Sequence, residues 1–471
     1  MKNINIKFIG VFLLMILVLG SCKKWIDTDL NTNPDAPQDV PMSSLLPTIQ
    51  ADMGYNTVGG NDNVRVTSMW LQYLSGVARQ SEAEADYLYR DLDVNNLWNS
   101  TYSTTMIDLK KLLGKAAEEK HYYFMGIGQV LMANALGVTT DVWGDLPYKE
   151  AFQGQANLTP KFDSQEAIYT EIKSLLDSAV VNLSKTFKGK TKGDLMYNGN
   201  AGLWLKAAHA LRARYALHLS KVSPGTAYAE ALAHIPDAFS SNDEDLAFPF
   251  LTSDAATNPF FQFMEQRGDM TMHKTFIDML NLRFDPRVTK FAALAPDTTY
   301  RGADWGETGE NASLPGIYAA STDSPVPFIS YVECLFIKSE CLFKTNDEAG
   351  AKVALFDALK ASMEKHGVYS DLYYNAYVAQ VSAVTGDLLF KEIMTQKYIS
   401  LFYQLEAYND WRRTDNVIGL VSNPNAAPGS VANEIPRRFP YSTDEKAYNP
   451  NTPVVANIWQ RVWWDAGAPS K

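Results

Sequence analysis

The cysteine at position 22 is the residue whose surroundings point most directly to a chemical modification. It follows Lys2, Lys7 and an apolar run from Phe8 to Leu19. That run is shorter than the roughly twenty residues that a membrane-spanning helix needs. A positively charged start followed by a short apolar core is typical of a secretory signal peptide. We therefore expect the chain to be exported and the segment before Cys22 to be removed.

The residues Leu19-Gly20-Ser21-Cys22 resemble the cleavage box of a bacterial lipoprotein, in which the peptide is cut before the cysteine and the thiol is acylated. This motif predicts a signal peptide over residues 1–21 and lipidation of Cys22. Each buried methylene contributes about 0.8 kcal/mol, so several acyl chains hold a protein at a membrane firmly. The alternative is an ordinary signal peptide with a chance cysteine. Residues 22–43, rich in Pro, Asn and Asp, predict an extended leader.

The rest of the sequence offers little that could carry out catalysis. No HExxH, GxSxG or GxGxxG motif is present, and carboxylates are too numerous for any pair to stand out. The acidic alternation in the leader lacks the glycine and the closing glutamate of a calcium loop. We therefore expect no enzyme activity, no cofactor and no metal site. The histidines show no metal-ligand spacing at their positions, which are 121, 209, 218, 234, 273 and 366.

Composition narrows the class of protein further. The formal net charge is -11 and the sequence pI is about 5.1, so nothing favours nucleic-acid binding. Hydrophobic residues make up 46% and aromatic residues 12% of the chain, which is ample material for a core. Beyond residue 21, no stretch is long and apolar enough to span a bilayer.

Apolar stripes at steps of three and four residues predict that the chain is mostly helical. Helix pairs are expected at about 199–238 and 329–366, and a further pair joins 121–137 to 164–183. Pairs of this length resemble tetratricopeptide repeats, which stack because one pair cannot bury its apolar face alone. Long polar insertions separate the helices, at 54–65, 79–93, 138–162, 240–270, 295–326 and 414–458.

The segment KEIMTQKYISLFYQLEAYNDWRRTD predicts one helix with two distinct faces. Its apolar face runs from Met394 to Tyr408. Glu406, Asp410 and Arg413 form a second face of opposite charges at steps of four and three residues. We interpret this face as a structural ion-pair cluster rather than a catalytic one.

Several segments carry a family resemblance. The sequences EIMTQKYISLF, EAYNDWRRTD and IPRRFPYSTDEKAYN look like the closing signature of the SusD/RagB outer-membrane lipoproteins, in the SusD-like branch. DVWGDLPYKEAF resembles the central segment of that family, and LNTNPDAPQ resembles its N-terminus. The likeness extends from Cys22 to about Asn451.

The resemblance implies a single SusD-like domain over 44–471, with tetratricopeptide-like helix pairs supporting an irregular, loop-rich lobe. It implies a lipid-anchored protein on the outer face of the outer membrane that binds glycans or peptides without chemistry. Such a protein closes as a lid over a SusC-like, TonB-dependent transporter and delivers the nutrient to it.

Two loops are the expected ligand site. One contains Arg79, Tyr87 and Tyr89, and the other contains Tyr300 and Trp305. The family places ligand contacts in roughly these regions, although no motif transfers residue by residue. The alternative for each aromatic residue is ordinary loop packing.

Two other functions stay open at this point: a lipid-anchored hydrolase that acts on surface glycan or peptide, and a tethered adaptor of the tetratricopeptide type with no small ligand. Release of product from candidate glycans or peptides would indicate the hydrolase. Co-purification with a transporter-sized barrel would favour the receptor over the adaptor.

Mass spectrometry of the natural protein tests the first expectation. We expect the chain to begin at Cys22 and to carry fatty acyl groups there. A protein that retains residues 1–21, or that has a free thiol at position 22, would contradict the predicted anchor.

Overall fold

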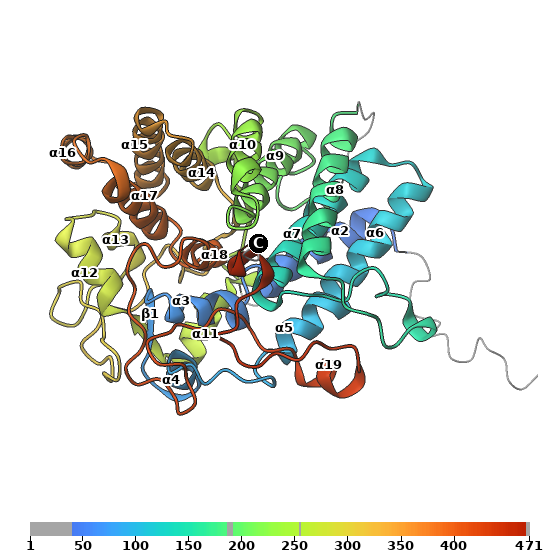
Figure 1. Ribbon diagram of the computed structural model, residues 1–471, viewed down its shortest axis with the longest axis horizontal. Coiled ribbons are helices and arrows are strands. Elements are labelled where there is room, and N and C mark those ends of the chain that lie inside the picture. The colour runs from blue at the N-terminus through green and yellow to red at the C-terminus, as the bar shows by residue number, and fades with distance from the viewer. Residues whose placement is uncertain (1–39, 186–191, 254–255, 468–471) are drawn as a thin grey trace, which may run out of the picture. The chain divides into compact units, whose positions relative to one another are not determined.

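Helix pairs packed side by side form the larger part of the fold (Figure 1). The structure, a computed structural model, describes residues 40–185, 192–253 and 256–467. We call the following helices the stack, since each packs against other members of the group: α6 (Ile107–Glu118), α7 (Tyr122–Trp143), α8 (Gln165–Leu183), α9 (Ala201–His218), α10 (Pro224–His234), α14 (Tyr331–Lys344), α15 (Glu348–Lys365), α16 (Asp371–Val381) and α17 (Gly386–Ser400).

The predicted helix pairs are confirmed. Helix α7 packs on α8, α9 on α10 and α14 on α15, and α10 contacts α14, so that one pair follows the next. Small residues allow this close packing. A Cβ atom at Gly137 of α7 would lie 2.1 Å from the hydroxyl oxygen of Tyr215 on α9, so only glycine fits where these helices meet.

The start of α8 follows from local chemistry. Ser164 is its N-cap, and the Ser164 hydroxyl accepts a hydrogen bond from the backbone N–H of Ala167. The carboxylate of the preceding residue, Asp163, accepts the backbone N–H groups of Tyr148 and Lys149. It therefore fixes the loop before α8.

The expectation of one continuous helix near the C-terminus is wrong. The chain forms α17 and then α18 (Leu405–Arg413), separated by a turn in which Tyr403 adopts a left-handed φ of 59°. A non-glycine residue in this conformation is unfavourable inside a helix. The break lets α18 run in a different direction from α17. All nine residues of α18 are buried.

The lobe, which we define as the elements outside the stack, has short helices and strands. The predicted insertions 54–65 and 79–93 are not loops throughout, because they contain helical turns. The helices are α2 (Met42–Asp52), α3 (Val66–Trp70), α4 (Arg79–Ala85), α5 (Asn95–Ser100), α11 (Pro259–Arg267), α12 (Lys274–Leu282), α13 (Val288–Phe291), α18, α19 (Thr443–Tyr448) and α20 (Trp463–Ala466). Single π- or 3₁₀-turns are η2 (Met53–Thr57), η3 (Asn61–Arg65), η4 (Thr101–Met106), η5 (Gly154–Ala156), η6 (Ile235–Asp237) and η7 (Asn242–Glu244).

Among the described residues, strands pair only in short antiparallel ribbons. β1 (Leu74–Gly76) pairs with β3 (Met270–Met272), with Leu74 opposite Met272. β2 (Leu246–Phe248) pairs with β4 (Val326–Ile329). Both ribbons join segments that are far apart in the sequence. The first places the chain before α4 beside the chain before α12.

Some expectations lie outside the described residues. These are the signal peptide over 1–21, the lipidation of Cys22 and all but the end of the leader over 22–43. From Met42 onward the chain forms one compact unit. Within the described ranges, no helix combines the length and the apolar character needed to cross a membrane. Cys334 and Cys341 are buried free thiols on one helix.

Candidate functional site

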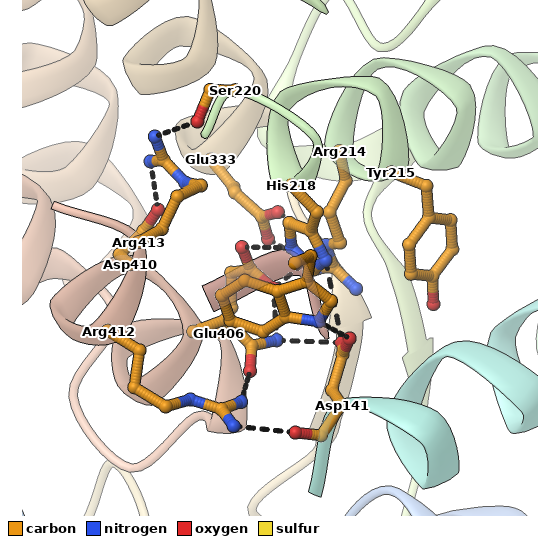
Figure 2. A network of polar contacts seen from close by, with 12 residues as sticks. Asp141, Arg214, Tyr215, His218, Ser220, Glu333, Glu406, Asp410, Arg412 and Arg413 are labelled. Atoms are coloured by element: carbon orange, nitrogen blue, oxygen red, sulfur yellow. Dashed lines mark hydrogen bonds and ion pairs between the residues drawn. The ribbon is translucent and has the colours of Figure 1, made fainter. Parts of the chain in front are cut away.

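Charged side chains gather inside the protein where helices of the stack meet α18, as the centre of the group in Figure 2 shows. All are at most 6% exposed. Since removing a charge from water is costly, each needs a partner. We call these residues the charge cluster: Asp141, Arg214, His218, Glu333, Glu340, Lys397, Glu406, Asp410, Arg412 and Arg413.

His218 of α9 lies at the centre of the cluster between two carboxylates. Its Nε2 is 2.8 Å from a carboxylate oxygen of Glu406, and its Nδ1 is 2.8 Å from the hydroxyl of Tyr169. That hydroxyl donates to Asp141 at 2.5 Å, so it accepts from His218. Both ring nitrogens therefore act as donors, which is the hydrogen-bonding pattern of a protonated imidazole.

Electrostatics agree with this assignment. Burial alone would lower the pKa of His218, but the negative charges of Glu406 and Asp141 outweigh it and raise that pKa to about 9. Burial alone would raise the pKa of the Glu406 carboxyl, and the charge of His218 brings it below the ordinary value. Near neutral pH the pair is thus an imidazolium and a carboxylate.

Two arginines from other helices bind glutamates that lie seven residues apart on α14. Arg214 of α9 binds Glu333 through two hydrogen bonds of 2.6 and 2.5 Å. Arg413 of α18 binds Glu340 in the same way at 2.5 and 2.7 Å and also binds Asp410 at 2.6 Å. Two-point arginine–carboxylate contacts fix orientation as well as distance. These contacts join α14 to both α9 and α18.

The charge cluster has the residue types of acid–base catalysis but not the access. An adjacent internal cavity, lined in part by Asp141, Arg214 and Glu406, has a volume of about 50 Å³. That is space for a few water molecules and not for a nutrient. No trio of His, Cys, Asp or Glu side chains in the described ranges could hold a metal ion. The cluster is a structural junction, as the ion-pair interpretation of Glu406, Asp410 and Arg413 predicted.

Sequence reasoning missed most of this cluster. It noted for His218 only the lack of metal-ligand spacing, and it did not single out Asp141, Glu333 or Glu340. One signal was available: glutamates seven residues apart inside the largely apolar segment YVECLFIKSECLF lie on one helix face. Which charges would meet them could not be deduced, since the arginines that bind them, Arg214 and Arg413, lie 119 and 73 residues away in the sequence.

The first predicted ligand loop begins with an exposed guanidinium. Arg79 opens α4 in a left-handed conformation with φ of 53°, and its side chain is 55% exposed. It donates a hydrogen bond to the carbonyl of Arg267, and its Nε lies 3.5 Å from the buried carboxylate of Asp269. Non-glycine residues in this region of backbone space cluster at binding sites.

Tyr87 and Tyr89 are buried, at 3% and 5% exposure, and do not stand out from the loop as exposed rings. The hydroxyl of Tyr87 accepts the backbone N–H of Asn423 at 2.8 Å. The hydroxyl of Tyr89 donates to the carbonyl of Asp62 at 2.7 Å. Tyr89 nevertheless lines an open cleft of about 550 Å³, together with Arg90 and other residues. Their role as ligand contacts stays a prediction.

The two predicted contacts of the second loop, Tyr300 and Trp305, lie against different ends of α12. The carbonyl of Tyr300 accepts a hydrogen bond from Asn281 near the end of α12. Trp305 instead packs against His273 at the start of that helix, with ring centroids 4.4 Å apart. Eight residues of helix separate the two partners by about 12 Å. Tyr300 and Trp305 are both half-buried, and their contacts lie near opposite ends of α12. Their role as ligand contacts stays a prediction.

The loop that carries Trp305 contacts the chain segment that leads to Arg79. Gly309 packs so closely against Val77 and Thr271 that a Cβ atom would lie 2.9 Å from either side chain. Two residues before Arg79, Val77 donates its N–H to the carbonyl of Asp269. The two predicted loops therefore meet beside the β1–β3 ribbon.

The segment that follows α18 joins this place to Tyr87, a link that sequence reasoning missed. The side chain of Asn425 faces Gly306, and Asn423 binds the chain at the end of α4. Farther along, Trp459 packs edge to face on Tyr87 at 6.3 Å. Figure 1 shows this C-terminal segment passing α4 on its way to α19. We call this group of residues, contributed by the two predicted loops and the segment after α18, the aromatic band: Arg79, Tyr87, Tyr89, Trp305, Asn425 and Trp459.

The aromatic band offers binding groups rather than reactive ones. Trp305 and Trp459 are half-buried rings, and Arg79 and Asn425 supply hydrogen-bond groups. Asp304 and Glu307, the carboxylates beside Trp305, accept backbone N–H groups of their own loop. Flat rings with nearby polar groups suit recognition of an amphipathic ligand without covalent chemistry.

Comparison with known proteins gives the family. The profile SusD-like_2, described as "Starch-binding associating with outer membrane", matches residues 34–442. No curated protein matches the chain significantly.

Solved structures share the fold. A SusD/RagB family protein from Bacteroides thetaiotaomicron is similar with a TM-score of 0.78 at 24% identity, covering 92% of this chain and 100% of that chain. A chitin-binding SusD homolog from Flavobacterium johnsoniae has a TM-score of 0.78 at 22% identity, covering 91% and 99%. A SusD homolog from Bacteroides vulgatus has a TM-score of 0.78 at 21% identity, covering 91% and 98%.

Replacing the central histidine tests the charge cluster. We expect His218→Gln to lower the free energy of unfolding by about 3–5 kcal/mol, because the variant removes the nearest charged partner of buried Glu406. Chemical denaturation at pH 7 measures this. As a control, Lys360→Gln removes an exposed ion pair with Glu364 and should cost less than about 1 kcal/mol. Equal effects of the two variants would contradict the assignment.

The same histidine predicts a dependence on pH. Its pKa is higher in the folded protein than the usual value of 6.5, so its stabilising charge is fully present below about pH 6.5 and is lost as pH rises through about 9. The difference in unfolding free energy between wild type and His218→Gln should therefore shrink from pH 6.5 to pH 10. A difference that stays constant over this range would contradict a protonated His218.

Proposed function

The chain belongs to the SusD-like family, described as starch-binding and associating with the outer membrane, and from this premise we propose that it is a surface receptor that binds an oligosaccharide nutrient at the aromatic band. The observation that carries the proposal is the position of Trp305, a half-buried indole on a loop that meets the chain leading to Arg79. Sugar rings have apolar faces that stack on aromatic rings and hydroxyl groups that pair with guanidinium and amide groups. A peptide is the second ligand class.

We further propose that acylated Cys22 anchors the receptor in the outer membrane, exposed at the cell surface, and that it delivers its ligand as a lid to a SusC-like, TonB-dependent transporter. The family description supports association with the outer membrane. The lipoprotein box and the polar leader support a tether that allows hinged motion. The broad outer surface of the stack offers room for a protein partner.

Hydrolysis is not part of the proposal. A glycosidase needs two carboxyl groups placed on either side of the bond that it cuts. Beside Trp305 the available carboxylates, Asp304 and Glu307, already accept backbone N–H groups. An adaptor with no small ligand is disfavoured by the half-buried tryptophans of the aromatic band.

Binding measurements test the proposed site. We expect Trp305→Ala to weaken binding of an oligosaccharide identified on a glycan array by at least about tenfold, because a stacked ring contributes on the order of 1.4 kcal/mol or more. Tyr89→Ala should also weaken binding, through loss of support at the cleft that it lines. Isothermal titration calorimetry on the soluble form measures both, and a peptide array run in parallel decides the ligand class.

Tyr122→Ala is the matched control. Tyr122 lies at the start of α7 in the stack, is 37% exposed and is not part of the aromatic band, so its loss should leave binding unchanged. If Trp305→Ala and Tyr89→Ala both bind as wild type does, the site lies elsewhere even though the receptor function can hold.

Incubating the protein with its ligand distinguishes a receptor function from hydrolase activity. We expect the ligand to be recovered unchanged after prolonged incubation, and the natural protein to co-purify with a transporter-sized barrel from membranes. Product release would indicate the hydrolase. Absence of both a saturable ligand and a barrel would indicate the adaptor.

A further inference from the structure

His273 lies directly beneath the proposed ligand contact Trp305. It follows β3 and is the N-cap of α12, where its Nδ1 accepts the backbone N–H of Thr275 at 3.0 Å. The side chain is almost wholly buried. A ring nitrogen that accepts a hydrogen bond carries no proton, so a neutral imidazole in this position has its proton on Nε2.

The imidazole is neutral near pH 7. Burial lowers the pKa of His273 to about 4, and neighbouring Lys274 lowers it as well, against a smaller opposing effect of Asp304. The tautomer is therefore fixed by the helix cap: Nδ1 is the acceptor and Nε2–H is the donor.

The Nε2–H group has no polar partner among the residues that the structure describes. A buried N–H group without a partner is unfavourable, and native proteins rarely leave one. The neighbouring group that can accept it is an aromatic face. The rings of His273 and Trp305 have centroids 4.4 Å apart and planes inclined at 63°. This arrangement places the edge of one ring against the other, as in an N–H···π contact.

The backbone holds the two rings together. Residues 273 and 303 form a parallel β-bridge, in which Lys274 donates its N–H to the carbonyl of Ala303 at 2.9 Å. A Cβ atom at Gly302 would lie 2.3 Å from the backbone of His273, so the two bridged chain segments approach as closely as glycine allows. Trp305 follows Ala303, the residue that forms this bridge, by two positions.

We propose that His273 is a positioning residue for ligand binding: its Nε2–H donates to the indole face of Trp305 and holds that ring in the orientation that the ligand meets. The inference rests on the proposed function, since it takes Trp305 to be a ligand contact. His273 itself is buried and acts through Trp305.

A spectroscopic test examines the contact without any ligand. In the ¹⁵N-histidine-labelled full chain, long-range ¹H–¹⁵N spectra report which nitrogen of each imidazole carries the proton, and His273→Asn identifies the signals. We expect His273 to be the Nε2–H tautomer, with its Hε2 resonance moved upfield by the indole and restored in Trp305→Leu. A proton on Nδ1, or an Hε2 resonance that is the same in both proteins, would overturn the contact.

A binding test examines the consequence. His273→Asn keeps a side-chain oxygen that can cap α12, and His273→Phe keeps a ring, but both lose the donor to Trp305. Each should weaken binding of the array-selected oligosaccharide by about two- to fivefold, with a thermal midpoint near that of the wild type for His273→Asn. His209→Asn, on α9 in the stack, is the control and should bind as the wild type does.

The outcomes separate this inference from the proposed function. If Trp305→Ala weakens binding while both His273 variants bind as wild type does, the site is upheld and the positioning role is overturned. If Trp305→Ala has no effect, Trp305 is not a ligand contact and the positioning role is overturned; the proposed site itself is wrong only if Tyr89→Ala has no effect either. In that case the tautomer spectrum still decides whether the ring contact exists.

Discussion

The pairing of buried charges on α18 is the constraint on which the arrangement of this protein depends. All nine residues of α18 are buried, yet four of them are Glu406, Asp410, Arg412 and Arg413. A buried ion pair contributes little net stability, but breaking one is costly, so such pairs select one arrangement over others. The partners come from α7, where Arg412 binds the Asp141 carbonyl, and from α9, α14 and α17. Only one docking of α18 against the stack satisfies all of them.

That docking sets the course of the chain after α18. The guanidinium of Arg412 donates to the carbonyls of Asp141 and Arg437, and Arg437 pairs with Asp465. These contacts fix the segment 414–462 at both ends, against the stack and beneath α20. Between them the segment lies along α4, where Asn423 and Trp459 contact Tyr87. The position of the aromatic band thus depends on charges that are buried away from it.

This arrangement suits a receptor that must present a preformed surface. Side chains that are locked by packing and hydrogen bonds lose little conformational freedom when a ligand binds. The burial of Tyr87 and Tyr89 fits this view, because their hydroxyls hold the backbone of neighbouring loops. If the proposed site is correct, the ligand meets the few residues that remain partly exposed, among them Trp305 and Arg79.

The sequence by itself determined the helical character, the helix pairs near 199–238 and 329–366, and the ion-pair face of Glu406, Asp410 and Arg413, because apolar and charged periodicity are local properties of the chain. It also marked the loops that carry Arg79 and Trp305. Only the tertiary structure decided that Tyr87 and Tyr89 are buried, that Tyr300 lies apart from Trp305, and that His218 is charged. Burial, and the pKa that follows from it, depend on partners distant in sequence, and no local pattern encodes which of those partners will meet.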